Sequence, residues 1–264
     1  MQLQDIVGIV TGGAAGIGRA LAETILSAGG NVLITDINTS LLETTGQELA
    51  AKFGKANVGW TQQNVVEMDS FHRIFDVATN HFKKPVNLLI NNAGIGGDLD
   101  FWKGDAPRNW EDVITIDLTA VIRGSQVAIQ QFRKHLGGNE GVVINVSSAA
   151  GFMATPFFPQ YGAAKAGVIG FTRSCHPLKK QHNIRVVALC PAFVDSALSK
   201  LAIEVSPKLI QRLGGVMDVS KVVDGFEMAL NDPNNSGRCI LIVPTGSSYF
   251  PFAGDKHLYP EAKL

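Results

Sequence analysis

Short apolar runs rich in β-branched residues alternate with longer stretches of helix-like spacing along the whole chain of 264 residues. The short runs predict strands at residues 6–11, 31–35, 57–62, 87–91, 141–146, 184–189 and 239–243. We expect helices to begin near Ile17, Thr39, Glu67, Arg108, Tyr161 and Val219. Near-continuous apolar strands are typical of a parallel sheet covered on both faces. The pattern therefore predicts one α/β domain over residues 1–264, with a doubly wound parallel sheet of about seven strands.

The irregular stretches follow the later predicted strands, at residues 95–107, 147–160, 191–215 and 245–264. In doubly wound folds, ligands bind at the carboxyl ends of the strands. We therefore expect the functional residues in these stretches and in the glycine-rich turn after the first strand.

Composition excludes several classes of partner. Lys plus Arg number 23, and Asp plus Glu also number 23, with no run of like charge, so neither nucleic acid nor an anionic membrane is indicated. The cysteines, Cys175, Cys190 and Cys239, are scattered without metal-ligand spacing, so we expect free thiols in a reducing compartment and no metal. The first residues do not resemble a signal peptide, and residues 141–164, although uncharged, contain too many polar residues and prolines to predict a membrane span.

The segment TGGAAGIG, with Gly12, Gly16 and Gly18, joins a predicted strand to a predicted helix. Such spacing allows a tight turn, a close approach of backbone N–H groups to a pyrophosphate, and a helix N-terminus facing that charge. A plain glycine turn is the alternative. Asp36 ends the second predicted strand, where its carboxylate can accept hydrogen bonds from ribose hydroxyls and would repel a 2′-phosphate. If Asp36 is not merely a turn residue, the two features favour NAD over NADP.

Two further segments fit a dinucleotide site. Asn91, Asn92, Ala93 and Gly94 follow an apolar strand, where small residues let an adenosine lie against the backbone and amides can bridge adjacent strands. Asn64 follows the third strand and can reach an adenine amino group. Read alone, the first segment is also compatible with a simple turn.

The stretch NVSSAAGFMATPFFPQYGAAK carries the candidate chemistry. Tyr161 and Lys165 are four residues apart at the start of a helix, so their side chains share one face. A nearby ammonium lowers the pKa of a phenol, which makes proton transfer accessible near neutral pH. Ser148 ends the fifth strand, where its hydroxyl can bind a substrate oxygen. Taken alone, the Tyr–Lys spacing more often marks a surface helix.

All of these pieces together resemble the classical short-chain dehydrogenase/reductase family, from residue 6 to about residue 245. The resemblance implies a Rossmann fold, Tyr161 as catalytic acid/base, Lys165 as the residue that binds the nicotinamide ribose, and Ser148 as the donor to the substrate oxygen. It also implies that Ser196 takes the place of the family's cofactor-contacting threonine. The residues expected at the cofactor are Gly12, Gly16, Ile17, Gly18, Asp36, Asn64, Val65, Asn91, Ala93, Gly94, Tyr161, Lys165, Pro191, Val194 and Ser196.

Asp117 departs from the family pattern, because it stands where the family carries a catalytic asparagine whose main-chain carbonyl holds a water of the proton relay. The carbonyl survives the change. A carboxylate near Lys165 would alter the pKa values of the lysine and the tyrosine. We therefore count Asp117 among the catalytic positions and expect retained activity with a changed pH profile.

Within the family, residues 170–174 and 189–196 are most similar to NAD-dependent 15-hydroxyprostaglandin dehydrogenases, although Phe158 replaces a glutamine of that group. The substrate pocket is expected to use the aromatic residues Phe101, Trp102, Phe152, Phe157, Phe158 and Phe193. Residues 197–215 lie where the family carries its substrate lid. In that lid, Lys208 and Arg212 either meet a carboxylate or face solvent.

The sequence therefore predicts an NAD-dependent oxidoreductase that acts on a hydrophobic secondary alcohol or ketone, such as a hydroxy fatty acid, a prostaglandin-like lipid or a steroid. The alternative is an NAD-binding sensor or scaffold without turnover. The resemblance implies a homodimer or homotetramer, and the balanced charge indicates no nucleic-acid or membrane partner. The final tripeptide, Ala262-Lys263-Leu264, resembles a peroxisomal address, so we expect either a cytoplasmic or a peroxisomal location.

Overall fold

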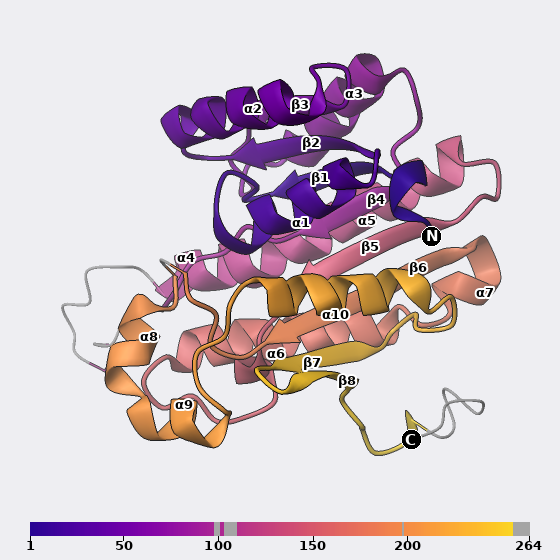
Figure 1. The fold of residues 1–264 in the computed structure, drawn as a ribbon. Helices are drawn as coiled ribbons and strands as arrows, with labels where there is room; N and C mark the ends of the chain where they lie inside the picture. Colours follow the sequence, from indigo (N-terminus) through magenta and orange to yellow (C-terminus); the bar gives the residue numbers. More distant parts are fainter. Residues whose placement is uncertain (98–100, 103–109, 197, 256–264) are drawn as a thin grey trace.

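The protein is built around one eight-stranded sheet with the strand order β3-β2-β1-β4-β5-β6-β7-β8 (Figure 1). The computed structural model describes residues 1–97, 101–102, 110–196 and 198–255. The strands are β1 (Val7–Thr11), β2 (Asn31–Asp36), β3 (Val58–Gln62), β4 (Leu88–Asn91), β5 (Gly141–Val146), β6 (Ile184–Pro191), β7 (Cys239–Val243) and β8 (Gly246–Tyr249). The pairs among β1 to β7 are parallel, and β8 pairs antiparallel with β7. This is the doubly wound α/β architecture of a Rossmann fold.

Helices cover both faces of the sheet (Figure 1). One face carries α1 (Gly16–Ser27), α2 (Thr39–Phe53) and α10 (Ser220–Asn231), and the other carries α3 (Ser70–Phe82), α5 (Ala120–His135) and α6 (Pro159–Ser174). Successive strand residues alternate between the two apolar cores; in β1, for example, Val10 packs on the first face and Ile9 on the second. Burial on both faces explains why the strands read as uninterrupted apolar runs.

The remaining helices are short and lie within the connections between the longer elements. They are α4 (Trp110–Ile114), α7 (Leu178–His182), α8 (Lys200–Val205) and α9 (Pro207–Arg212), together with the 3₁₀ turns Leu3–Asp5 and Ala149–Gly151. Between α4 and α5 the chain forms a π-helical segment, Thr115–Thr119. Interruptions of this kind occur often at functional sites, and this one carries Asp117.

The seven predicted strands are confirmed, each within a few residues of its predicted bounds. The prediction that residues 245–264 carry no regular structure was wrong at its start, because β8 forms there. Its sequence, GSSY, has no apolar alternation; the turn at Gly246, whose φ is 140°, reverses the chain so that β8 pairs along its whole length with β7. The predicted helix start at Arg108 and the tripeptide 262–264 lie outside the described residues.

Among the described residues, no helix is both long and apolar enough to cross a bilayer. In the same part of the chain, no three His, Cys, Asp or Glu side chains gather as a metal site would require.

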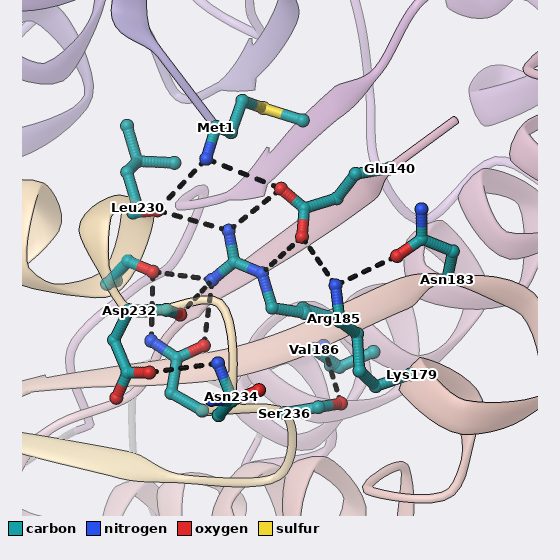
Figure 2. A network of polar contacts seen from close by, with 12 residues as sticks. Met1, Glu140, Lys179, Asn183, Arg185, Val186, Leu230, Asp232, Asn234 and Ser236 are labelled. Atoms are coloured by element: carbon teal, nitrogen blue, oxygen red, sulfur yellow. Dashed lines mark hydrogen bonds and ion pairs between the residues drawn. The ribbon is translucent and has the colours of Figure 1, made fainter.

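Arg185 lies on β6, far in sequence from its partners, and its side chain is fully buried (Figure 2). Its guanidinium donates to Glu140 Oε1 at 2.9 Å and to Asn235 Oδ1 at 2.8 Å. It also donates to the main-chain oxygens of Ala229 and Leu230, which belong to the last turn of α10. Arg185 thus satisfies the carbonyls left open at this helix end and fastens α10 to the sheet.

Glu140 is the anion that balances this network. Burial alone would raise its pKa, but hydrogen bonds from Arg185 and from Lys179, at 2.8 Å, lower the pKa from 4.5 to about 2. A full shift of that size corresponds to about 3 kcal/mol, and partial solvent access roughly halves it. Because the folded-state pKa is depressed, this stabilisation is present above pH 4.5 and is lost as the pH falls toward 2.

We predict that Glu140→Gln lowers the free energy of unfolding at neutral pH by about 1–2 kcal/mol, because it leaves the buried Arg185 charge without its anion. The difference from the wild type should shrink as the pH is lowered through the range where Glu140 titrates. Urea unfolding at a series of pH values measures both effects.

Glu67→Gln is the matched control, since Glu67 pairs with Arg73 at 3.5 Å with both side chains about half exposed. It should change the free energy of unfolding by no more than about 0.5 kcal/mol. Equal effects of the two substitutions would contradict the role given to the Arg185 network.

Candidate active site

The predicted catalytic residues meet at the carboxyl end of the sheet. Ser148 follows β5, and Tyr161 and Lys165 lie in the first half of α6, whose first residue is Pro159. The Lys165 ammonium lies 5.4 Å from the centroid of the Tyr161 ring. The Ser148 hydroxyl donates to the Pro191 carbonyl at 3.4 Å and accepts from the Ala150 N–H at 3.1 Å. The structure therefore brings Ser148, Tyr161 and Lys165 together, and the two hydrogen bonds of Ser148 fix its side chain.

Lys165 is held in the interior by two oxygens. Its ammonium lies 3.1 Å from Asp117 Oδ2 and donates to the Val146 carbonyl at 3.2 Å. The side chains of Lys165 and Asp117 are 5% and 0% exposed, so this is a buried ion pair. A buried charge of this kind is tolerated only with a partner, and Asp117 supplies it.

Asp117 is itself fixed on its other oxygen, Oδ1, which accepts from the Ile95 N–H at 2.8 Å. The π-helical segment that carries Asp117 is packed against α6. Gly94 is adjacent, and a Cβ at that position would lie 3.3 Å from Asp117 Oδ1. The carboxylate therefore connects α6 to the segment after β4. An asparagine at this position would lack the negative charge that pairs with Lys165.

The pKa values of the three groups depend on one another. Burial raises the pKa of the Tyr161 phenol above its ordinary value; Lys165 opposes this, and the Asp117 charge reinforces it. Burial alone would lower the pKa of Lys165, but Asp117 and Tyr161 outweigh burial and raise it. Burial also raises the pKa of the Asp117 carboxyl, against the lowering effect of Lys165.

These directions change one expectation from the sequence. Lys165 does act to lower the pKa of Tyr161, as predicted, but its effect does not dominate in the protein alone. Removal of the phenol from water and the facing carboxylate of Asp117 both favour the neutral phenol. Tyr161 is therefore held protonated at neutral pH in the protein without ligands.

Sequence reasoning missed two residues that position the site. Ser147 is buried and donates from its hydroxyl to the Lys165 carbonyl at 2.9 Å, which ties β5 to α6. Ile95 provides the backbone N–H that orients Asp117. The serine pair after the strand was a sequence signal for Ser147. Ile95 acts through its backbone, so its side chain gives no such signal.

The glycine turn after β1 has the geometry that its spacing suggested. Gly12 and Gly16 adopt φ values of 62° and 52°, in the left-handed region that favours glycine. A Cβ on Gly18 would lie 2.3 Å from the Gly12 carbonyl oxygen, so only glycine allows α1 to begin this close to the turn. At Gly16 a Cβ would meet nothing within 4 Å, so this side of the turn is open.

The N-terminus of α1 offers room and donors for a diphosphate. Its N-cap residue, Ala15, makes no side-chain cap hydrogen bond, so the first N–H groups of the helix are not satisfied by a cap. Asp36 ends β2 beside the turn, and its carboxylate accepts from the Ala14 N–H at 3.3 Å and the Asn38 N–H at 3.0 Å. Ile17 is half-buried in the first turn of α1. These residues fit a dinucleotide with free ribose hydroxyls.

The Asn91–Gly94 segment fastens this turn to the sheet. Asn91 is buried, and its amide donates to Asn145 Oδ1 on β5 at 2.9 Å, so it bridges strands. Asn92 donates to the Thr11 and Gly12 carbonyls, both at 2.9 Å. The Ala93 N–H donates to the Thr11 hydroxyl at 3.1 Å.

The other predicted cofactor residues lie along the same edge of the sheet. Asn64 follows β3, where it accepts from the Val66 N–H at 3.3 Å, and Val65 packs on the second core. Pro191 ends β6, and Val194 is buried and bridges to Met217. The Ser196 hydroxyl lies 3.1 Å from that of Ser199.

A cavity of about 900 Å³ opens beside Ser148 and Tyr161. Its walls come from the loop after β5, from the segment after β6 and from the lid helices α8 and α9. The predicted residues Phe157, Phe158 and Phe193 line it, together with Met153 and lid leucines. A large, mostly apolar cavity beside a few polar groups is the usual form of a small-molecule site.

Three predicted pocket residues do not line this cavity. Phe152 turns toward the C-terminal segment instead, where it stacks on Phe250 with ring centroids 3.9 Å apart. Phe101 and Trp102 pack edge-on against each other at 4.8 Å, and Trp102 is 78% exposed. The placement of Phe152 follows from the aromatic surface of the tail, which the strand pattern did not reveal.

The family model described as short chain dehydrogenase matches residues 7–205. The chain is also 31% identical over 264 residues to the 15-hydroxyprostaglandin dehydrogenase (NAD(+)) of Bos taurus, which covers 95% of each chain. The chain belongs to the short-chain dehydrogenase family.

The chain is also similar to family members that are named for other activities. A 3-oxoacyl-acyl-carrier-protein reductase, FabG, from Aquifex aeolicus is 31% identical over 84% of this chain and 90% of its own. Among solved structures, a short chain dehydrogenase/reductase from Burkholderia phymatum in complex with NAD superposes with a TM-score of 0.77 at 26% identity, covering 91% of this chain and 90% of its own.

We predict that Asp117→Asn moves the rising limb of the pH–rate profile for alcohol oxidation to lower pH. The substitution removes the negative charge that raises the pKa of Tyr161, so the phenolate forms more readily. Initial rates across a pH series, with substrate and cofactor saturating, measure the shift.

Asp112→Asn is the control, since Asp112 lies exposed on α4, five residues before Asp117. It should leave the profile in place. An unmoved profile in Asp117→Asn would show that the buried ion pair does not govern proton transfer.

Proposed function

We propose that this short-chain dehydrogenase is an NAD-dependent oxidoreductase that interconverts a hydrophobic secondary alcohol and its ketone. The observation that carries the proposal is that Ser148 and Tyr161 line the same apolar cavity of about 900 Å³. A proton-transfer group thus stands in the wall of a site that suits an apolar molecule.

Each catalytic residue has a defined part. Ser148 turns its hydroxyl hydrogen from the Pro191 carbonyl to the substrate oxygen, while the Ala150 N–H continues to hold its side-chain oxygen. Tyr161, protonated in the free protein, donates its hydroxyl proton to the ketone oxygen during reduction; oxidation requires its phenolate, which takes the proton of the alcohol hydroxyl. Lys165 stabilises the phenolate, and Asp117 together with the Val146 carbonyl holds the ammonium in place.

The cofactor supplies, when bound, the group that accepts the hydride from the carbinol carbon. The open turn at Gly12 and Gly16 and the uncapped start of α1 would hold its diphosphate. Asp36 would accept from the ribose hydroxyls and disfavour a 2′-phosphate. The relatives named for NAD support the same assignment.

The substrate class is a lipid-like alcohol. The cavity lining is dominated by Phe, Leu, Met, Val, Ala and Pro side chains, and one relative is named for hydroxyprostaglandin. Hydroxy fatty acids, prostaglandin-like lipids and steroids all present a secondary alcohol within an apolar frame. Phe158 lines the cavity, so an apolar contact is available there.

The proposal includes a homodimer or homotetramer. The residues Ala163, Ala166 and Gly170 of α6 are exposed, and their small size would let a helix of a second copy approach closely.

The direct test is a panel of secondary alcohols, hydroxy fatty acids, steroids and sugars, assayed with NAD and NADP. For the alcohol that is turned over, Tyr161→Phe should lower kcat by about 10²–10⁴-fold, because the proton acceptor is lost. NAD binding, measured by calorimetry, should persist.

Tyr249→Phe serves as the control, since Tyr249 lies on β8 and its hydroxyl donates to Asp232 at 2.6 Å, not to a group of the site. It should retain nearly full turnover. An absence of turnover across the whole panel, despite tight NAD binding, would contradict the proposed function.

We also predict that Asp36→Asn reduces the preference for NAD over NADP, expressed as the ratio of kcat/KM values, by about tenfold or more. The amide keeps one oxygen to accept from the Ala14 N–H but loses the charge that repels a 2′-phosphate. Asp69→Asn, an exposed change before α3, is the matched control. An unchanged ratio would count against the position assigned to the adenosine ribose.

A further inference from the structure

Two solvent-exposed cations lie in the wall of a mostly apolar cavity. Lys208 and Arg212 both line it, and they are the only charged side chains among the described residues that do. No aspartate or glutamate belongs to that described lining. The cavity that holds Ser148 and Tyr161 therefore carries positive charge without a matching anion of its own.

The two side chains share one side of the lid. They are four residues apart on α9, which places both on the same helix face, where like charges repel each other. Within the part of the chain that the structure describes, neither forms an ion pair. Arg19, Lys52 and Lys179, by contrast, each meet a carboxylate. An anion between Lys208 and Arg212 would relieve the repulsion.

We propose that Lys208 and Arg212 form a carboxylate-binding subsite that receives the charged end of a chain-like substrate whose alcohol lies at Ser148 and Tyr161. This inference rests on the proposed function and narrows its substrate class to apolar secondary alcohols that carry a carboxylate. Steroids and neutral alcohols have the alcohol group but lack the carboxylate that would bind Lys208 and Arg212.

A carboxylate suits this pair for a chemical reason. The arginine fork can hold both carboxylate oxygens, and the lysine adds a point charge that tolerates small changes of position. Phe157, Leu201 and Leu209 lie in the same lining and would cover the methylene chain between the two ends. Because α9 and α6 are separate elements, the substrate would fix the lid relative to the catalytic helix (Figure 1).

The first experiment measures binding without chemistry. Palmitate and methyl palmitate are titrated into the NAD-saturated protein below their micellar concentrations, with hexadecyl phosphate as a third ligand. Palmitate should bind about five- to tenfold more tightly than the ester, with an advantage that declines as salt is added. Equal affinities for acid and ester, or an advantage confined to the phosphate, would overturn the proposal.

The second experiment uses Lys208→Gln/Arg212→Gln, in which glutamine keeps the helix propensity of α9. This double variant should lose the advantage of palmitate and bind the ester as the wild type does. Lys200→Gln is the control, because Lys200 is an exposed lysine of the same lid outside the described cavity lining. Equal losses for acid and ester in the double variant would indicate damage to the lid and would overturn the subsite.

Turnover separates this inference from the proposed function. A mid-chain hydroxystearate and its methyl ester are assayed with NAD; the double variant should raise KM for the acid about tenfold and leave the ester unchanged. If neither is oxidised but palmitate binding remains charge-selective, the subsite stands and the proposed function fails. If both are oxidised with equal KM values in wild type and double variant, the subsite fails and the function stands.

Discussion

The active site depends on a buried ion pair. Lys165 lies in the interior beneath Tyr161, and its charge is stable there because Asp117, also buried, stands 3.1 Å away. A lysine without such a partner would lose its proton or turn toward solvent. The π-helical segment before α5 is what brings the carboxylate to this depth. Proton transfer and the packing of α6 against this π-helical segment thus rest on the same contact.

This contact also joins the two halves of the site. Asp117 is oriented by Ile95, which directly follows the Asn91–Gly94 segment, and that segment is hydrogen-bonded to Thr11 and Gly12 of the cofactor turn. The structure therefore offers a continuous path of hydrogen bonds and packing from the glycine turn to Lys165. A ligand seated at the turn would meet the same backbone that positions the catalytic lysine.

Much of this could be predicted from the sequence, because the determining signals are local. Apolar strands, the left-handed glycines and the spacing of Tyr161 and Lys165 each follow from a few neighbouring residues. What could not be predicted depends on contacts between distant segments: β8, the stacking of Phe152 on Phe250, and the part played by Ile95. The net direction of the pKa of Tyr161 belongs with these, because it requires burial, Lys165 and Asp117 to be weighed together.

The central claim is that burial and Asp117 keep Tyr161 protonated in the free protein despite the adjacent lysine. The chain has three tyrosines, so carbon-13 NMR of ring-labelled tyrosine, with Tyr161 assigned by its substitution with phenylalanine, can follow this phenol directly through a pH titration. The structure predicts that the pKa of Tyr161 lies above its ordinary value of 10.0. A pKa below that value in the free protein would contradict the account, because it would mean that Lys165 outweighs both burial and Asp117.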